Sequence, residues 1–298
     1  MKILFFIFFS TFYFQVNSQK LEGYVIDITN ENKLSFVNIA FKNLDKGTYS
    51  NQDGYYTINL KEVDFGDSLI VSHIGYETKS FKLSDFKKDK NNNLNIKLVP
   101  KNDFLNEVYI SDKKTKYNWF ADNLGTNKKT VFTSSVPFGY EVSVFINNKK
   151  RKLAKLEELK LKFKKQDETL FDLYKTYYRI SFYKKDENNF PGELLSYENI
   201  IIRPENKNKT IKINLKNKNL FLPKDGFFIG VETINPNDTS PKNSMYLTYP
   251  NLLYTHSEEK ITFKRYRGKK WNKDYMKSVF KKDYFKVPYI NLKVKYVK

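Results

Sequence analysis

Most of the chain alternates between apolar and polar residues with a period of two. The alternating stretches lie at residues 37–42, 56–60, 94–98, 159–164, 178–182, 211–215, 227–231 and 290–296. Successive side chains of a strand point to opposite faces of its sheet, so this pattern predicts half-buried β-strands. Turn signals such as "NQDG" (51–54) and "FPGE" (190–193) separate the stretches. At 149–159, where leucines recur every three residues, a helical turn also fits, but the alternation that follows favours a strand. The sequence therefore predicts an all-β protein.

The spacing of the predicted strands divides the chain into two β-sandwiches. Six or seven short strands fall within residues 19–100, which is typical of a small sandwich. Residues 101–130 are polar and rich in lysine, and we expect a linker there, interrupted by "LNEVYI" (105–110) as a final strand or an extended segment. Strands resume in 131–298, which predicts a second, larger sandwich or jelly roll of unknown function.

The first 18 residues have the layout of a secretory signal peptide. Lys2 precedes an uncharged apolar run at 3–14, shorter than the ~20 apolar residues that span a bilayer. Val16 and Ser18 are small residues placed as they are before a cleavage site. We expect cleavage after Ser18, no transmembrane segment afterwards, and export to the periplasm, the outer-membrane surface or the medium. An uncleaved membrane anchor is the alternative.

Composition narrows the classes of partner. The net charge is +20, but only five of the 53 basic residues are arginine, and the lysines are spread along the whole chain. Because arginine is the usual reader of phosphates and bases, we expect no nucleic-acid partner and a stronger attraction to acidic glycans or lipid headgroups. The chain has no cysteine. This excludes disulfides, thiol catalysis and a lipid anchor on cysteine.

Five motifs in the first predicted sandwich carry a family resemblance. They are "GYVID" (23–27), "FVNIAF" (36–41), "GTYSNQDGYYTINL" (47–60), "DSLIVSHIGYETKSF" (67–81) and "LNIKL" (94–98). This region resembles the carboxypeptidase regulatory-like domain, a transthyretin-like seven-stranded sandwich common in exported and outer-membrane proteins of Bacteroidetes. In carboxypeptidases this sandwich lies beside the catalytic domain and holds no catalytic residue. The resemblance therefore implies a structural or interaction module rather than a peptidase.

The family pattern places residues with structural roles, and this chain carries them as Gly23, Thr48, Asp53-Gly54-Tyr55 and Ser72-x-x-Gly75-Tyr76. Asp53-Gly54 is hairpin chemistry, in which glycine takes a positive φ without steric conflict. Gly75 lets the chain turn between strands, and Tyr76 offers its ring to the core. Phe36 departs from the pattern, since the family often has proline-leucine there. Nothing in the pattern requires an imidazole at position 73, so we expect His73 to be architectural.

The second predicted sandwich resembles uncharacterised sandwich domains of Bacteroidetes surface proteins more loosely. In those domains an arginine-bearing strand precedes a Pro-Gly turn, as "YYRISFYKKDENNFPGELL" (177–195) does here. The pattern has no assigned activity and supplies no residues to transfer.

No catalytic constellation stands out in the sequence. His256 and Glu259 have the His-x-x-Glu spacing of a zinc peptidase, but no histidine follows them, and catalytic zinc is typically held by three protein ligands. We expect no catalytic residue, no metal site and no cofactor. A pair of carboxylates in the second sandwich, about 5–10 Å apart, would instead indicate a glycan-directed hydrolase.

Aromatic residues make up 17% of the chain and are the remaining candidates for a binding role. Tyr266, Trp271 and Tyr275 stand among lysines, and Trp119 lies in the predicted linker. They could bind sugar or pin a loop to its sheet. We expect a non-enzymatic exported envelope protein that binds a glycan or a protein partner. A hydrolase and an accessory component of an outer-membrane receptor are the alternatives, and the sequence leaves the oligomeric state open.

Overall fold

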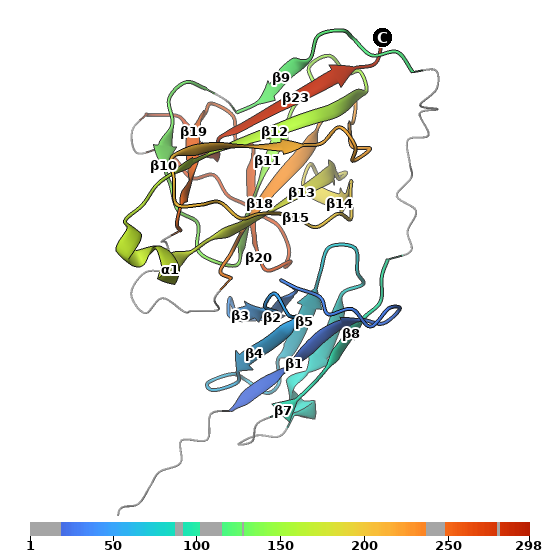
Figure 1. Ribbon diagram of the computed structural model, residues 1–298, viewed down its shortest axis with the longest axis vertical. Coiled ribbons are helices and arrows are strands. Elements are labelled where there is room, and N and C mark those ends of the chain that lie inside the picture. Colours follow the sequence, from blue (N-terminus) through green and yellow to red (C-terminus); the bar gives the residue numbers. More distant parts are fainter. Residues whose placement is uncertain (1–18, 87–91, 102–114, 127, 237–247, 279–280) are drawn as a thin grey trace, which may run out of the picture.

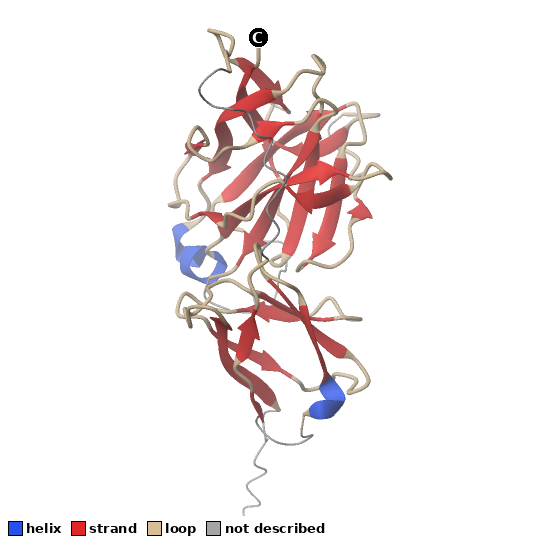
Figure 2. Cartoon of the chain, turned by 90° about the vertical axis from the view of Figure 1, so that its right-hand side faces the viewer, coloured by secondary structure: helices blue, strands red, loops and turns tan. Residues whose placement is uncertain are grey.

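The structure is a computed structural model that describes residues 19–86, 92–101, 115–126, 128–236, 248–278 and 281–298. The predicted signal peptide and the segment 105–110 lie outside these residues. The described chain forms two β-sandwiches stacked along the long axis of the molecule (Figure 1), and helical turns are few and short (Figure 2). The all-β prediction is confirmed. None of the helices described is both long and apolar enough to cross a membrane.

The N-terminal sandwich is built from two small sheets. One has the order β4-β1-β7, with β8 also paired to β1, and the other has the order β3-β2-β5-β6. The strands are β1 (Lys20–Asp27), β2 (Asn38–Phe41), β3 (Gly47–Tyr49), β4 (Tyr55–Asn59), β5 (Ser68–Ser72), β6 (Lys79–Lys82), β7 (Asn92–Asn93) and β8 (Ile96–Leu98), with a 3-10 turn η1 (Leu83–Asp85) after β6. Alternate residues of β1 and β4 point inward to a core that includes Leu21, Val25, Tyr56 and Ile58.

The last two strands of this sandwich act as one strand broken in the middle. Both β7 and β8 run parallel to β1. Between them, Asn95 accepts a hydrogen bond from the backbone of Tyr24 at 2.9 Å, and Leu94 accepts one from the Tyr56 hydroxyl. A Cβ on Gly23 would lie 2.2 Å from the carbonyl oxygen of Leu94. Glycine at position 23 therefore allows the broken strand to lie against β1.

The C-terminal sandwich has two larger sheets. The first has the order β10-β19-β12-β23-β9, with β16 and β17 on β12 and β22 on β19. The second has the order β14-β13-β18-β11-β20-β21, with β15 on β13. Its elements are β9 (Asp122–Gly125), β10 (Phe132–Thr133), β11 (Tyr140–Ile146), β12 (Ala154–Lys164), η2 (Glu168–Leu170), α1 (Phe171–Tyr174), β13 (Tyr177–Lys185), β14 (Pro191–Leu194), β15 (Ile200–Ile202), β16 (Lys209–Asn214), β17 (Phe221–Leu222), β18 (Phe227–Ile234), β19 (Asn251–Ser257), β20 (Thr262–Tyr266), β21 (Asn272–Lys273), β22 (Phe285–Pro288) and β23 (Ile290–Tyr296).

The alternation of apolar and polar residues holds in the sheet that contains β12 and fails in the sheet that contains β13 and β18. On β12, apolar residues face the core and lysines face outward, so the stretch 149–159 enters a strand rather than a helix. By contrast, all eight residues of β18 and the first seven of β13 are buried. One face of these two strands meets the core. On the other face, part of the side chains turn toward the N-terminal sandwich, while Tyr183 and Phe228 pack against Phe263 of β20. Part of the predicted linker is also sheet, because β9 pairs with β23.

Candidate functional site

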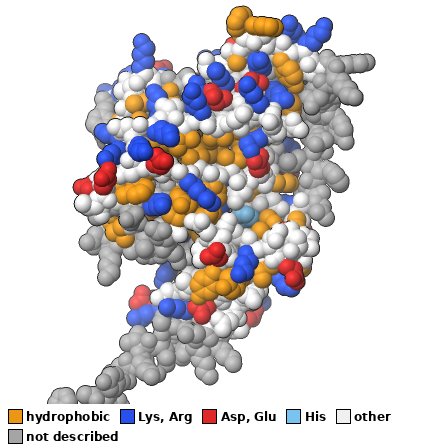
Figure 3. Space-filling view, in the orientation of Figure 1, with side chains coloured by type: hydrophobic (Ala, Val, Ile, Leu, Met, Phe, Trp, Pro, Cys, Tyr) orange, Lys and Arg blue, Asp and Glu red, His pale blue; other side chains and the backbone are white. Residues whose placement is uncertain are grey.

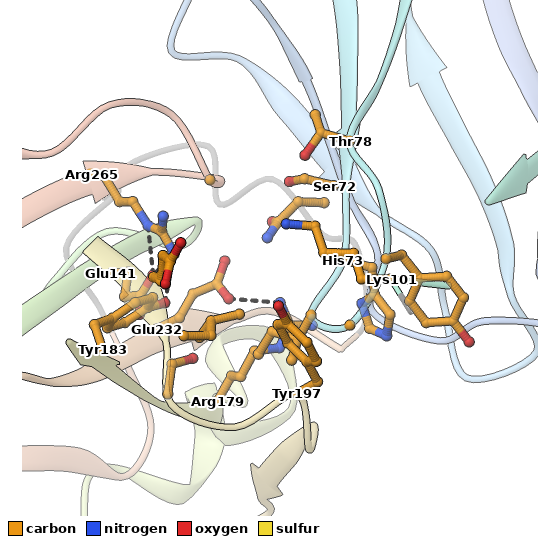
Figure 4. A pocket seen from close by; sticks show the side chains of 18 of the residues that line it. Ser72, His73, Thr78, Lys101, Glu141, Arg179, Tyr183, Tyr197, Glu232 and Arg265 are labelled. Carbon is orange, nitrogen blue, oxygen red and sulfur yellow. Dashed lines mark hydrogen bonds and ion pairs between the residues drawn. The ribbon is translucent and has the colours of Figure 1, made fainter. Parts of the chain in front are cut away.

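A cavity of about 260 Å³ lies between the two sandwiches. The N-terminal sandwich supplies residues around the end of β5, and the C-terminal sandwich supplies β11, β13, β18, β20 and the loop after β14. Figure 4 shows Glu141, Tyr183 and Arg265 on one side, with Ser72 and Thr78 on the other. Much of this lining is polar or charged. We call it the interface cavity.

One wall of the interface cavity is a row of four charged residues on neighbouring strands. Arg265 of β20 lies opposite Glu141 of β11, Glu141 lies opposite Glu232 of β18, and Glu232 lies opposite Arg179 of β13. Directly opposed residues of antiparallel strands point to the same face, so all four side chains reach the interface. The strand register therefore places two carboxylates side by side, with an arginine outside each.

Each carboxylate in the row is buried and fully hydrogen-bonded. Glu141 is 3% exposed; its Oε2 accepts from Arg265 Nε at 2.8 Å and its Oε1 from the Tyr183 hydroxyl at 2.8 Å. Glu232 is also 3% exposed; its Oε2 accepts from Arg179 Nη1 at 2.8 Å, and the Tyr49 hydroxyl lies 3.1 Å from its Oε1. Each carboxylate oxygen thus has a protein donor within hydrogen-bond distance, and Glu232 Oε1 shares the single proton of the Tyr49 hydroxyl with the carbonyl oxygen of Thr233, also 3.1 Å away.

The Glu141 carboxylate fills the space that a side chain at position 230 would occupy. Gly230 lies two residues before Glu232 on β18, and a Cβ there would fall 2.1 Å from Glu141 Oε1. Burial raises the pKa of the Glu141 carboxyl, Arg265 lowers it, and the neighbouring Glu232 raises it; the net shift is upward. The Glu141 carboxyl therefore takes up a proton more readily than an exposed glutamate does.

Several bonds from the C-terminal sandwich end on the N-terminal one. Arg179 Nη2 donates to the carbonyl oxygen of Phe36. Arg267 Nη1 donates to the carbonyl oxygen of Thr48 at 2.7 Å, and its guanidinium lies 3.8 Å from the centre of the Tyr49 ring. Around these bonds an apolar cluster joins Phe36 and Tyr49 to Tyr177 and Ile234. Arginine and aromatic contacts together fasten the two sandwiches.

Unusual backbone conformations shape both sides of this interface. Phe36 has φ of 57°, a left-handed conformation that is rare for a bulky residue, and its ring packs edge-on against Tyr177. Gly75 has φ of 80°, and a Cβ on it would lie 3.3 Å from Tyr197 of the other sandwich. The glycine-tyrosine corner therefore faces the interface, while the Tyr76 hydroxyl donates to Asp27 at 2.8 Å.

Two polar atoms of the N-terminal sandwich are buried beside the cavity without a hydrogen bond from the described residues. They are Asn38 Oδ1, on a side chain from β2, and His73 Nδ1, from the end of β5. Asn38 is only 6% exposed. Burial and the nearby Arg179 lower the pKa of His73 to about 3, so its imidazole is neutral at physiological pH. Asn38 and His73 thus line the interface cavity, each with a polar atom that has no hydrogen-bond partner among the described residues.

The lining suits recognition of a small polar molecule. Hydroxyl, amide and imidazole groups lie on the N-terminal side together with the cation Lys101, and the charges on the opposite wall are already paired. Among the described residues, no three side chains of the metal-binding types converge. Glu141 and Glu232 lie opposite one another on this wall, but each carboxylate oxygen already accepts a bond from the protein.

His256, the first residue of the His-x-x-Glu spacing, is part of a strand. It lies within β19, is 7% exposed, and its Nε2 is 2.8 Å from Ser278 Oγ. Phe132 lies against its ring, with centroids 4.7 Å apart. Glu259 is exposed beyond the end of the strand. The His-x-x-Glu spacing is therefore split between a buried strand position and the surface.

The three aromatic residues proposed for binding do not line the interface cavity. Tyr266 is buried and its hydroxyl accepts a bond from Arg267. Trp271 is half-buried, with Arg265 4.3 Å from its ring centre. Tyr275 is half-buried against Phe285. Of the residues proposed as structural, Gly75 and Tyr76 line the cavity, whereas Gly54 takes φ of 76° in the turn before β4.

No motif in the sequence points to the charged row, but two signals for it exist. The chain has five arginines among 53 basic residues, and three of them, Arg179, Arg265 and Arg267, are at this interface. Charged residues also occur inside β13 and β18, where apolar runs predict burial. Rare arginines and glutamates within buried strands mark the site.

Among the comparisons with known proteins, the family match covers only the N-terminal part of the chain. No curated protein matches the sequence. Among solved structures, BcpA, the major pilin subunit of Bacillus cereus, aligns with 9% identity and a TM-score of 0.21, over 85% of this chain and 66% of the pilin chain. Residues 21–110 match the family model of the CarboxypepD_reg-like domain. The N-terminal sandwich is thus similar to that domain, as its motifs indicated.

Proposed function

We propose that this protein is an exported, non-enzymatic binding module whose interface cavity takes a small hydroxyl-rich group, such as the end of an envelope glycan. The N-terminal match to a regulatory-like domain supports a structural or binding role. The signal-peptide layout of the first 18 residues supports export. The charged row and the arginine contacts hold both halves of the cavity in one arrangement, which favours binding without a large rearrangement.

One observation carries the proposal. Buried polar groups in folded proteins are nearly always hydrogen-bonded, yet Asn38 Oδ1 and His73 Nδ1 have no partner among the described residues and lie on the same cavity wall. A sugar hydroxyl can donate to the asparagine oxygen and either donate to or accept from the imidazole. These two atoms therefore match the bonding pattern of a hydroxylated ligand.

The test compares binding and stability in the same variants. A glycan array probed with the full-length protein should show binding that Asn38→Leu and His73→Phe abolish. An asparagine that serves a ligand is a poorly satisfied buried group, so Asn38→Leu should leave the melting temperature unchanged or raise it. A blank array would overturn the glycan proposal, and a large loss of stability in Asn38→Leu would show that the side chain serves the fold.

The hydrolase alternative has one observation in its favour, the adjacent Glu141 and Glu232 with a raised pKa at the first. We place it second because a general acid must present its proton to the substrate, whereas all four oxygens here are held by arginine and tyrosine. Release of reducing ends from envelope polysaccharide, measured with the wild type and Glu141→Gln, decides between the two. Release that the substitution abolishes would establish the hydrolase.

A further inference from the structure

A lysine-rich surface covers the outer face of the larger C-terminal sheet. The apolar residues of β12 point into the core, so its alternate residues point outward beside those of β16 and β23. In the upper part of Figure 3, lysine and arginine side chains gather where Figure 1 shows β12 and β23. We call this surface the lysine face; it comprises Lys155, Lys160, Lys162, Lys212, Lys216, Lys293 and Lys295 together with Glu157 and Glu158.

The two glutamates neutralise only part of this charge. Lys160 Nζ lies 3.2 Å from Glu158 Oε1, and Lys293 Nζ lies 4.0 Å from the same oxygen. Lys216 Nζ is 3.9 Å from Glu157. The strand register brings Lys160 opposite Lys212 and Lys155 opposite Lys295. Like charges directly opposite one another destabilise a sheet, so the fold alone gives no reason for this arrangement.

Two aromatic rings stand at the edge of the lysine face. Trp119 is 85% exposed and Phe120 is 81% exposed, far more than the other large apolar side chains described. Both residues border a hollow of about 420 Å³ that Lys212, Lys293 and Lys295 also line. Adjacent rings left in water are unfavourable and commonly mark a binding surface.

We propose that the lysine face binds an acidic polysaccharide, whose carboxylate or sulfate groups pair with the lysines while its sugar rings stack on Trp119 and Phe120. A protein partner fits less well, because the cores of protein interfaces are depleted of lysine and enriched in arginine. A nucleic acid also fits less well, because no arginine is present here to read phosphates or bases in pairs of bonds. A lysine ammonium is a compact point charge that pairs with a single anionic group, whether a carboxylate or a sulfate. This proposal does not depend on the interface cavity.

The test uses polygalacturonate as the acidic probe and dextran as the neutral one, titrated into the full-length protein by calorimetry. We expect much tighter binding to polygalacturonate than to dextran, and binding to polygalacturonate should weaken at least tenfold between 50 and 200 mM salt because several ion pairs form. Trp119→Ala combined with Phe120→Ala should weaken binding at least tenfold. So should the triple lysine-to-glutamine variant at 212, 293 and 295, with a smaller salt dependence. The same titrations are repeated in the Asn38→Leu background, where the interface cavity contributes nothing, and the losses caused by the ring and lysine variants should persist there.

A charge-matched control makes the test specific to the face. Lys61, Lys82 and Lys97 are exposed on the N-terminal sandwich, and replacing all three with glutamine lowers the net charge by the same amount. This control should retain wild-type affinity. Equal loss in the control, equal binding to dextran, or tighter binding to anionic lipid vesicles or duplex DNA than to polygalacturonate would each overturn the proposal.

Discussion

Replacing Arg179 with methionine should destabilise the protein more than any change to an exposed ion pair. Its guanidinium is 2% exposed and bonds Glu232, Phe36 and Asn199. Methionine keeps the apolar bulk but leaves the Glu232 carboxylate buried without its cation. Removing one partner of a buried pair typically costs about 3–5 kcal/mol. Because the Tyr49 hydroxyl still lies 3.1 Å from that carboxylate, we expect the lower end, about 3 kcal/mol.

Urea unfolding at pH 7 measures this loss, with circular dichroism reporting both sandwiches and tryptophan fluorescence reporting the C-terminal one. Adding Glu232→Gln to Arg179→Met removes the stranded charge, so the double variant should recover at least about 1 kcal/mol. Arg203→Met is the matched control, because Arg203 is exposed and should change stability by less than about 1 kcal/mol. The reasoning would be refuted by an Arg179→Met loss no larger than the control's, or by a double variant no more stable than the single one.

Three further changes probe other parts of the interface. Gly230→Ala should lower the free energy of unfolding by about 1–3 kcal/mol, because its Cβ would strike the Glu141 carboxylate at 2.1 Å; a neutral result in urea titration would contradict this. The unfolded chain takes up a proton at His73 at a higher pH than the folded chain does. The free energy of unfolding should therefore fall as the pH drops from 6.5 toward the folded pKa of about 3, by up to about 2 kcal/mol at pH 5. His73→Gln should remove the His73 contribution to the pH dependence of the melting temperature, while the contribution of His256 remains. Gly75→Val should lower the free energy of unfolding by about 1–3 kcal/mol, because position 75 has φ of 80°. An unchanged melting temperature in differential scanning calorimetry would contradict this prediction.

The sequence predicts the parts of the fold that obey a local rule. On β12, alternation identifies both the strand and its outward lysines, because one face meets the core and the other meets water. On β13 and β18 the rule fails because both faces are buried: the second face meets the other sandwich at one end and an aromatic cluster of its own sandwich at the other. That partner surface is formed by Phe36 and Tyr49, distant in sequence from Arg179, and no local pattern announces their meeting.

The candidate site was hidden for a related reason. His73 and Gly75 were identifiable as a corner, but the corner's position at a cavity depends on how two sandwiches stack. Glu141 and Glu232 lie 91 positions apart and become neighbours only through the pairing of β11 with β18. A search for histidines and short motifs favours sites made from one segment, whereas this one is assembled from cross-strand neighbours.

The fastening of the two sandwiches also limits how this chain can be recombined in evolution. A regulatory-like sandwich that joins its neighbour by a flexible tether can be moved to a new gene with little change. Here the N-terminal sandwich offers a backbone oxygen at Phe36 and the ring of Tyr49 to arginines of its neighbour. Transplanted alone, it would expose that apolar pair, and the neighbour would be left with charges no longer shielded from water. The two sandwiches should therefore be inherited, lost and duplicated together.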